Sequence, residues 1–306
     1  IPEEYGGSNF GYLSLGLILE ELGRTLTASP LLSSGLAAAS ALILGGSDAQ
    51  KSTWLPKIAE GTAVGALAID EGAHHAPDKV AATVDAAGKL TGKKTFVLEG
   101  MAADILIVSA KGPDGVGLYL VKGDDAGVSR TRLHLADSRG AANIEFKGAA
   151  AEPLSGGAEL IDKVLDRARA GVAAEMLGSA LQAFETTLDY LKVRVQFGQV
   201  IGSFQALQHR AAKMFTDLEL SRSAVEAALA AIDADSPDVP ELVSLAKAKM
   251  GDTFHLVSNE MVQMHGGIGM TDAHDAGFYL KRARAAEATY GGQSYHRDRY
   301  ARIHGY

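Results

Sequence analysis

The sequence predicts an α+β multi-domain fold of the order helical, β, helical. From about residue 63 to residue 154 the segments are short, rich in β-branched residues and separated by glycine or aspartate turns, as in VGALAID and GVGLYLVKG. On both sides of this stretch apolar residues recur at helical spacing. We therefore predict an N-terminal helical domain (1–62), a small middle β-barrel or sandwich domain (63–154) and a C-terminal antiparallel four-helix bundle (155–306).

The first two parts follow from local patterns. LSLGLILEELGRTL has an apolar helical face, and GGSD indicates a helix stop followed by a fresh N-cap. The stretches DAAGKL and GPDGVG are typical of hairpin connections between strands. These signals predict helices first and then an antiparallel β domain.

Four long helical patterns follow. They begin at ELIDKVLDRARAGVAAEMLG, at SFQALQHRAAKM with Ser203 as the expected cap, at DVPELVSLAKAKM and at DAGFYLKRARAAEATY. Small residues dominate part of the first helix, which predicts close approach by neighbouring helices. These residues are Ala168, Ala170, Gly171, Ala173, Ala174, Gly178 and Ala180.

Composition narrows the function classes. Hydrophobic content of 47% with 22% charged residues is ordinary for a globular protein. The chain has no cysteine, which excludes disulfides, thiolate metal sites and cysteine nucleophiles. Its net charge of −8 argues against general nucleic-acid binding. No apolar run is long enough for a membrane span and no signal peptide is recognisable, so we expect a cytoplasmic protein.

The most informative stretch is KVRVQFGQVIGSFQALQHRAAKM. Arg194 ends one predicted helix, Phe197 and Gly198 form a turn, and the next helix begins directly afterwards. An arginine beside a helix N-terminus is suited to holding an anion such as a pyrophosphate. A plain turn with a surface arginine explains the spacing equally well.

A second stretch, QMHGGIGMT, contains three glycines that let backbone lie against a ligand or let one helix turn into the next. It is not the GxGxxG pattern that follows a strand in nicotinamide-binding folds.

Together these stretches resemble the acyl-CoA dehydrogenase family. RVQFGQVIGSFQALQH is similar to its R-x-Q-F-G-x-x-I-x-x-F-Q-x-x-Q-H signature and QMHGGIG to its Q-x-H-G-G-x-G loop. PEEYGG, ILEELGR and LTGKKTFVLEGMAADILIVSA resemble the N-terminal and β domains, so the resemblance covers the chain. Taken together, EATYGGQSYHR, SFQALQHRAAKM and QMHGGIGMTDAH most resemble the small-subunit branch, such as the small subunit of pimeloyl-CoA dehydrogenase and partner chains of two-gene steroid acyl-CoA dehydrogenases.

The resemblance implies FAD as cofactor, an acyl-CoA thioester as ligand, electron-transferring flavoprotein or a similar acceptor as partner, and a homotetramer or an α2β2 heterotetramer with a paralogous subunit. It also implies a role in fatty acid or steroid catabolism. The implied flavin contacts are Leu67, Ile69, Asp70, Phe96, Val97 and Leu98 in the β domain, and Arg194, Phe197, Gln205, Gln263, Met264, His265, Gly266, Gly267, Gln293 and Tyr295 in the C-terminal part, with Arg194, Phe197 and Gln205 serving the flavin of a neighbouring subunit.

One loop departs from the family. Its usual Thr-Glu-Pro is here Asp70 to Gly72, followed by AHHAPD. His74 and His75 beside two acids raise the alternative of a metal site, but no helix or strand spacing orients them, so we expect an exposed polar loop and no metal.

The family's catalytic base is missing from both usual positions. Dehydrogenation needs a carboxylate that takes the α-proton of the thioester while a hydride leaves to the flavin. In the family it most often follows an aromatic residue, where this chain has Gly291, and its second location aligns with Ala168. Small residues at both positions suggest extra room for a bulky substrate.

Several alternatives remain for the base. Glu175 lies on nearly the same helical face as position 168, about 10 Å further along, or it is a polar residue hydrogen-bonded inside the bundle. Asp166 with Arg167 and Arg169 is typical of a solvated or subunit-facing charge cluster. His296 has a group able to accept a proton.

The base can also belong to another polypeptide. The leading hypothesis is an FAD-dependent acyl-CoA dehydrogenase-type subunit that oxidises a CoA thioester. The second is a catalytically silent partner that supplies flavin-binding surface to an active paralogue, and the third is a helical binding protein that has lost the flavin.

Overall fold

A computed structural model describes all 306 residues, and the chain divides into two compact units. Unit 1 comprises Ile1–Phe10 and Ser29–Ala168, and unit 2 comprises Gly11–Ala28 and Arg169–Tyr306. Each unit is therefore assembled from separate stretches of the chain. The boundaries expected after residues 62 and 154 stay a prediction, because the compact units are divided at other positions.

Unit 1 begins with short helices. They are a 3-10 turn (Glu3–Tyr5), a π-helix (Leu31–Ala38), α2 (Ala39–Gly45) and α3 (Asp48–Ala59). A capping box starts α3: the Ser47 hydroxyl accepts from the Gln50 amide at 3.3 Å and the Gln50 side chain accepts from the Ser47 amide at 2.9 Å. The stop and fresh cap predicted at GGSD are thus confirmed.

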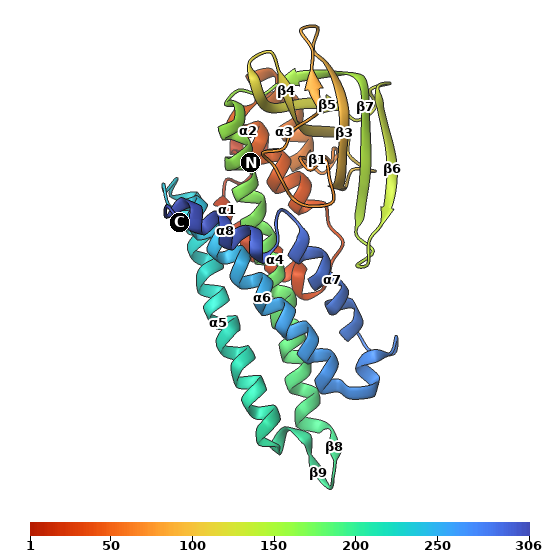
Figure 1. Ribbon diagram of the computed structural model, residues 1–306, viewed down its shortest axis with the longest axis vertical. Coiled ribbons are helices and arrows are strands. Elements are labelled where there is room, and N and C mark those ends of the chain that lie inside the picture. Colours follow the sequence, from red (N-terminus) through yellow and green to blue (C-terminus); the bar gives the residue numbers. More distant parts are fainter. The chain divides into compact units, whose positions relative to one another are not determined.

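A seven-stranded sheet forms the rest of unit 1 (Figure 1). Its strands run in the order β1-β4-β2-β3-β7-β5, with β6 paired to β7, and β5 pairs again with β4. This last pairing closes a ring, as expected for a barrel. The bounds are β1 (Gly65–Ala68), β2 (Thr83–Val84), β3 (Lys89–Leu98), β4 (Ile105–Gly112), β5 (Gly115–Lys122), β6 (Val128–His134) and β7 (Gly140–Pro153).

The strands obey the predicted turn chemistry. The GPDGVG stretch joins β4 to β5 antiparallel from Ile105 opposite Lys122 to Gly112 opposite Gly115, and DAAGKL joins β2 to β3. The interior is lined by apolar side chains, including Leu106, Val108 and Phe146, all at most 1% exposed. Both hairpins are confirmed.

Unit 2 is helical. The 37-residue helix α4 (Gly157–Val193) begins in unit 1 and enters unit 2 at Arg169. The other elements are α1 (Gly11–Arg24), hairpin strands β8 (Val195–Gln196) and β9 (Gln199–Val200), a 3-10 turn (Ile201–Ser203), α5 (Gln205–Asp233), α6 (Val239–His265), a 3-10 turn (Gly266–Met270), α7 (Ala276–Ala288) and α8 (Gln293–Ile303). The predicted bundle is present, and α8 adds a helix that was not predicted.

The small residues of α4 do allow the close approach that they predict. A Cβ on Gly178 would lie 1.8 Å from the carbonyl oxygen of Glu20 in α1, and one on Gly23 would lie 2.1 Å from the carbonyl oxygen of Glu175. The backbones of α1 and α4 therefore touch at two successive points, which only glycine permits.

The cap predicted at Ser203 was wrong. Helix α5 begins at Gln205 with Phe204 at its N-cap and no side-chain cap. The Ser203 hydroxyl instead donates to the carbonyl oxygen of Val200 at 2.6 Å, because the residues before α5 form their own 3-10 turn. Across the whole chain, no helix has both the length and the apolarity needed to cross a membrane.

Candidate functional site

The Gly291 turn, residues 289–292, joins α7 to α8 and holds the position where a base was expected. Both Tyr290 (φ 54°) and Gly291 (φ 106°) have left-handed backbone conformations. A Cβ on Gly291 would lie 2.5 Å from Cδ1 of Tyr295 and 3.0 Å from Nε2 of His296. The ring of Tyr295 thus occupies the space where a side chain at 291 would begin. The extra room inferred beside Gly291 was wrong for this reason.

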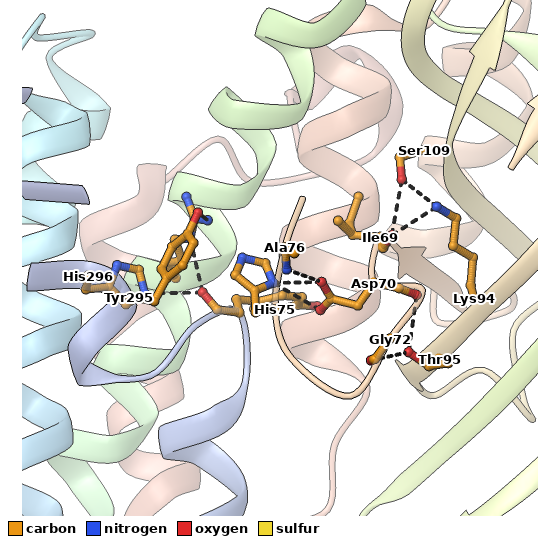
Figure 2. A network of polar contacts seen from close by, with 12 residues as sticks. Ile69, Asp70, Gly72, His75, Ala76, Lys94, Thr95, Ser109, Tyr295 and His296 are labelled. Carbon is orange, nitrogen blue, oxygen red and sulfur yellow. Dashed lines mark hydrogen bonds and ion pairs between the residues drawn. The ribbon is translucent and has the colours of Figure 1, made fainter. Parts of the chain in front are cut away.

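Two side chains bind the Tyr290 carbonyl oxygen in this turn. Arg169 Nε donates to it at 3.2 Å, and His296 Nε2 lies 3.2 Å from it. Arg169 Nη2 also donates to the Tyr295 hydroxyl at 3.0 Å, with its guanidinium over the tyrosine ring. Figure 2 shows Tyr295 beside His296.

His296 acts here as a neutral hydrogen-bond donor. Its side chain is fully buried, and burial together with the charges of Arg169 and Lys247 lowers the pKa of His296 to about 2. Since a carbonyl oxygen only accepts, Nε2 carries the hydrogen. The low pKa disfavours the alternative of His296 as base, which stays a hypothesis.

Lys247 is a functional candidate that the motifs did not single out. It lies on α6, is 1% exposed, and donates to the carbonyl oxygens of Ala286 at 3.1 Å, Glu287 at 3.0 Å and Gly291 at 3.0 Å. Burial, followed by the charge of Arg169, lowers the pKa of Lys247 to about 7. Its helical spacing from Val243 and Phe254, both buried, was the available sequence signal.

The acids near this turn are already paired. Glu175 accepts from Arg282 Nε at 3.1 Å and lies 3.0 Å from its Nη2, with both side chains at most 7% exposed. Glu287 binds Arg284 at 3.1 Å and His255 at 3.3 Å. The interpretation of Glu175 as a polar residue bonded inside the bundle is confirmed.

The charge cluster at the start of the long helix is buried. Asp166, Arg167 and Arg169 are 2%, 7% and 0% exposed, so the prediction of a solvated or subunit-facing cluster was wrong. Ala168, the second expected base position, is also fully buried and carries no group that accepts a proton.

At one end of unit 2 the structure brings the arginine stretch and the glycine stretch together. The rings of Tyr190 and His265 stack with centroids 4.3 Å apart, and the Tyr190 hydroxyl donates to the His265 carbonyl oxygen at 3.4 Å. Arg194 lies one helical turn beyond Tyr190, and Gly266 follows His265. The β8–β9 hairpin caps this end of α4 and α5 (Figure 1).

Several of the predicted flavin contacts are exposed at this end of unit 2. Arg194 is exposed and makes no ion pair, Phe197 at the hairpin tip is 91% exposed, and Gln205 is exposed. A Cβ on Gly266 or Gly267 would meet nothing within 4 Å. Packing within this chain therefore does not explain why position 267 is a glycine.

The other predicted residues of this region differ in exposure. Gln263 is exposed and Gln293 half-buried, whereas Met264 and His265 are 5% and 3% exposed. Burial and the ring of His274, 4.1 Å away, lower the pKa of His265. Met264 and His265 therefore support the loop from the core side.

The flavin contacts predicted in the β domain comprise buried residues and exposed ones. Leu67, Ile69 and Val97 are at most 4% exposed and belong to the core of unit 1. Phe96 is 50% exposed with φ 52°, and Leu98 is half-buried. The end of β3 therefore offers an outward-facing surface supported by buried neighbours.

A buried lysine organises the loop beside that strand. Figure 2 shows Lys94 Nζ donating to the Ile69 carbonyl oxygen at 2.9 Å and to Ser109 Oγ at 2.8 Å, and it also binds Glu71 at 2.7 Å. Burial raises the pKa of Glu71, but the hydrogen bonds from Lys94 and from the amides of Ala82 and Ala81 outweigh this effect and hold the pKa below its usual value.

The expectation of an exposed polar loop was wrong for His75. Its side chain is only 4% exposed, and its Nδ1 lies 3.0 Å from both carboxylate oxygens of Asp70 (Figure 2). Asp70 also accepts from the Ala76 amide at 3.2 Å. Both acids of the loop are bound to neighbouring residues, which hold the loop against unit 1. His74 alone of the two histidines is exposed.

Comparison with known proteins agrees with this architecture. Residues 1–62 match the model "Acyl-CoA dehydrogenase, N-terminal domain" and residues 155–304 match "Acyl-CoA dehydrogenase, C-terminal domain". The chain is 31% identical over 286 residues to acyl-CoA dehydrogenase IpdE2 of Mycobacterium tuberculosis, covering 94% of this chain and 76% of that protein.

Solved structures give the same result. A variant of the Tcur3481-Tcur3483 steroid ACAD is 32% identical with a TM-score of 0.93, covering 99% of this chain and 83% of that one. The ChsE4-ChsE5 complex from Mycobacterium tuberculosis is 28% identical with a TM-score of 0.93, covering 100% of this chain and 84% of that one. The sequence signatures, the helix–barrel–bundle order and these similarities show that the chain belongs to the acyl-CoA dehydrogenase family.

Proposed function

We propose that this chain is a partner subunit of a heteromeric, FAD-dependent acyl-CoA dehydrogenase that acts on a CoA thioester. In this role it contributes flavin-binding surface, and the carboxylate that takes the α-proton belongs to another polypeptide. The observation that carries the proposal is the Gly291 turn, which has no acid and whose side-chain space is filled by Tyr295.

The nearby acids support the same assignment. A general base must reach the proton it abstracts and must be free to accept it. The Glu175 carboxylate is committed to Arg282, and the Glu287 carboxylate to Arg284 and His255. Moving either acid into a substrate site would leave a cation without its partner, at considerable cost if the cation is buried.

The residues at the hairpin end of unit 2 fit an FAD molecule. The exposed, unpaired guanidinium of Arg194 suits a pyrophosphate, and the open space over Gly266 and Gly267 suits close approach by a ligand from outside the chain. Phe197 and Gln205 add an exposed ring and amide to the same surface. When bound, FAD supplies the hydride acceptor.

In this proposed role the residues of the chain bind and orient the cofactor. Arg194 and Gln205 would hold the dinucleotide, Tyr190 and His265 would keep the glycine loop in place, and Phe96 with Leu98 would present the end of β3. Two similar structures, the Tcur3481-Tcur3483 enzyme and the ChsE4-ChsE5 complex, are named as pairs of chains, which supports a paralogous second subunit here. Electron-transferring flavoprotein or a similar acceptor would reoxidise the complex.

The proposal is tested on the complex purified from its native host through a tag on this chain. We expect a second acyl-CoA dehydrogenase-type polypeptide, bound flavin, and bleaching of the flavin by a CoA thioester. Replacing the base carboxylate of the second polypeptide should abolish bleaching. Glu175→Gln in this chain, the matched control, should leave the bleaching of folded complex unchanged.

Two results would contradict the proposal. If the chain purified without any other polypeptide is yellow and is bleached by a thioester, it is a complete enzyme. If the complex with its partner shows no flavin absorbance, the chain is a helical binding protein instead.

A further inference from the structure

The end of helix α7 has an unusual cap. A helix leaves its last four carbonyl groups without intrahelical partners, and a glycine in left-handed conformation commonly resolves this. Helix α7 ends at Ala288, and the first residue after it with a left-handed conformation is Tyr290, not a glycine. The carbonyl groups of its last turn must therefore find other donors.

Those donors can be assigned one by one. The Ala285 carbonyl oxygen accepts from the amide of Thr289 at 3.2 Å and from its hydroxyl at 2.9 Å. The Ala288 carbonyl oxygen accepts from the Gly291 amide at 3.3 Å. The remaining two, those of Ala286 and Glu287, accept from Lys247.

Lys247 also reaches past the helix. Its Nζ donates to the Gly291 carbonyl oxygen at 3.0 Å, so a single group joins the last turn of α7 to the residue three positions beyond it. An ammonium carries three hydrogens, and three carbonyl oxygens lie within 3.1 Å of it. The C-terminal end of a helix also favours a positive charge.

This arrangement fixes the path of the Gly291 turn. Tyr290 and Gly291 are both left-handed, and a tyrosine persists in that conformation only when its surroundings impose it. Lys247 holds one end of the turn from α6, while Arg169 from α4 and His296 from α8 hold the Tyr290 carbonyl group.

We propose that Lys247 is the positioning residue of the Gly291 turn, the group that holds the turn in the conformation in which Tyr295 covers Gly291. Lys247 touches no reacting atom in this role. It acts through the carbonyl groups at the end of α7 and in the turn.

Amide hydrogen exchange followed by mass spectrometry tests this role in the chain itself. Lys247→Met keeps the length of the side chain and removes all three N–H donors. We expect peptides covering residues 289–296 to exchange at least about tenfold faster, while peptides from the middle of α5 keep their rates. The matched control is Lys249→Met on the same helix α6, which removes the lysine that pairs with Asp217 of α5, and it should leave the exchange of residues 289–296 unchanged.

A conservative variant guards against loss of folding. Lys247→Gln retains two N–H donors and should restore part of the protection that Lys247→Met loses. The role is refuted if Lys247→Met leaves the turn peptides unchanged, or if protection falls equally throughout unit 2. If Lys247→Met does not fold, Lys247→Gln alone must show the local increase for the role to stand.

A second measurement rests on the proposed function. In the heteromeric complex, Lys247→Met should raise the dissociation constant for the thioester about tenfold or more with flavin content retained, because the turn lines the expected site. If exchange changes locally and thioester binding does not, Lys247 still positions the turn but the turn does not contact substrate. The two outcomes therefore distinguish failure of this inference from failure of the proposed function.

Discussion

Tyr295 lies against the α-carbon of Gly291, so that a Cβ at position 291 would be 2.5 Å from Cδ1 of its ring. The expected base position is thus altered at two residues. Gly291 has no side chain, and the ring of Tyr295 fills the space where one would lie. The hydroxyl of Tyr295 is held by Arg169, which fixes the ring over the turn.

Restoring an acid at position 291 alone should therefore destabilise the chain. Gly291→Glu forces a side chain against the Tyr295 ring and onto a backbone with φ 106°, so we expect the free energy of unfolding to fall by about 2–4 kcal/mol. Combined with Tyr295→Ala, the same change should cost at least about 1 kcal/mol less than the sum of the two single changes. Urea denaturation of the four proteins measures this coupling, and strict additivity would mean that Tyr295 does not block position 291.

His296 should make stability depend on pH. Its pKa is about 2 in the folded chain and about 6.5 when unfolded, so below pH 6.5 only the unfolded state binds this proton. The stabilisation is present above pH 6.5 and is lost as the pH falls, by up to about 1.4 kcal/mol per pH unit. His296→Gln should remove this slope between pH 6.5 and pH 4, as measured by chemical denaturation.

The control for this experiment is His134→Gln, which replaces an exposed histidine on β6 and should leave the slope unchanged. If the wild-type protein and His296→Gln lose stability in parallel on acidification, His296 is not the neutral buried donor described above.

The Glu175–Arg282 pair should matter for folding and not for chemistry. Glu175→Gln leaves the buried guanidinium without a carboxylate, and we expect the free energy of unfolding to fall by about 3–5 kcal/mol. Replacing both residues, as Glu175→Leu with Arg282→Met, should recover most of that loss because no buried charge is left unpaired. Thermal or urea unfolding measures both. A double variant less stable than Glu175→Gln would show that the pair stabilises the chain beyond mutual neutralisation.

Arg194 should affect flavin retention alone. Arg194→Ala removes an exposed guanidinium without an intramolecular partner, so the free energy of unfolding should change by less than about 0.5 kcal/mol. In the heteromeric complex we expect the dissociation constant for FAD to rise at least about tenfold, read from visible absorbance after dialysis. Lys192→Ala is the control: Lys192 lies two residues earlier, is also exposed and pairs with Asp189. Equal flavin loss in both variants would indicate a general charge effect.

Much of the fold could be predicted because it depends on local patterns. The barrel followed from turn residues such as Gly88 and Gly115, and the close approach of a neighbouring helix to α4 from small residues such as Gly178. The family signatures singled out Arg194 and Gly266, which lie beside residues of the Tyr190–His265 ring pair at one end of unit 2. Their predicted meeting with a flavin across a subunit boundary stays a prediction.

What could not be predicted depends on contacts between segments distant in sequence. The missing side chain at Gly291 suggests an empty space, but the ring of Tyr295 fills it. Lys247 resembles any helical lysine until the carbonyl groups around it are known. Likewise the residue types of His75 and Asp166 suggest solvent exposure, yet the His75 side chain is 4% exposed beside Asp70 and Asp166 is 2% exposed.

The chain passes between its two compact units at Phe10–Gly11, at Ala28–Ser29 and at Ala168–Arg169, the last of these inside the continuous helix α4. A cut after Ala168 leaves every residue of unit 1 on one fragment, but it divides α4 and separates the stretch Gly11–Ala28 from the rest of unit 2. No single cut therefore releases unit 2 as an intact fragment, and we expect its helices to fold only in a polypeptide that also carries residues 11–28. During ribosomal synthesis all residues of unit 1 are present once Ala168 has been made, whereas α1 must wait for the C-terminal helices before unit 2 can close.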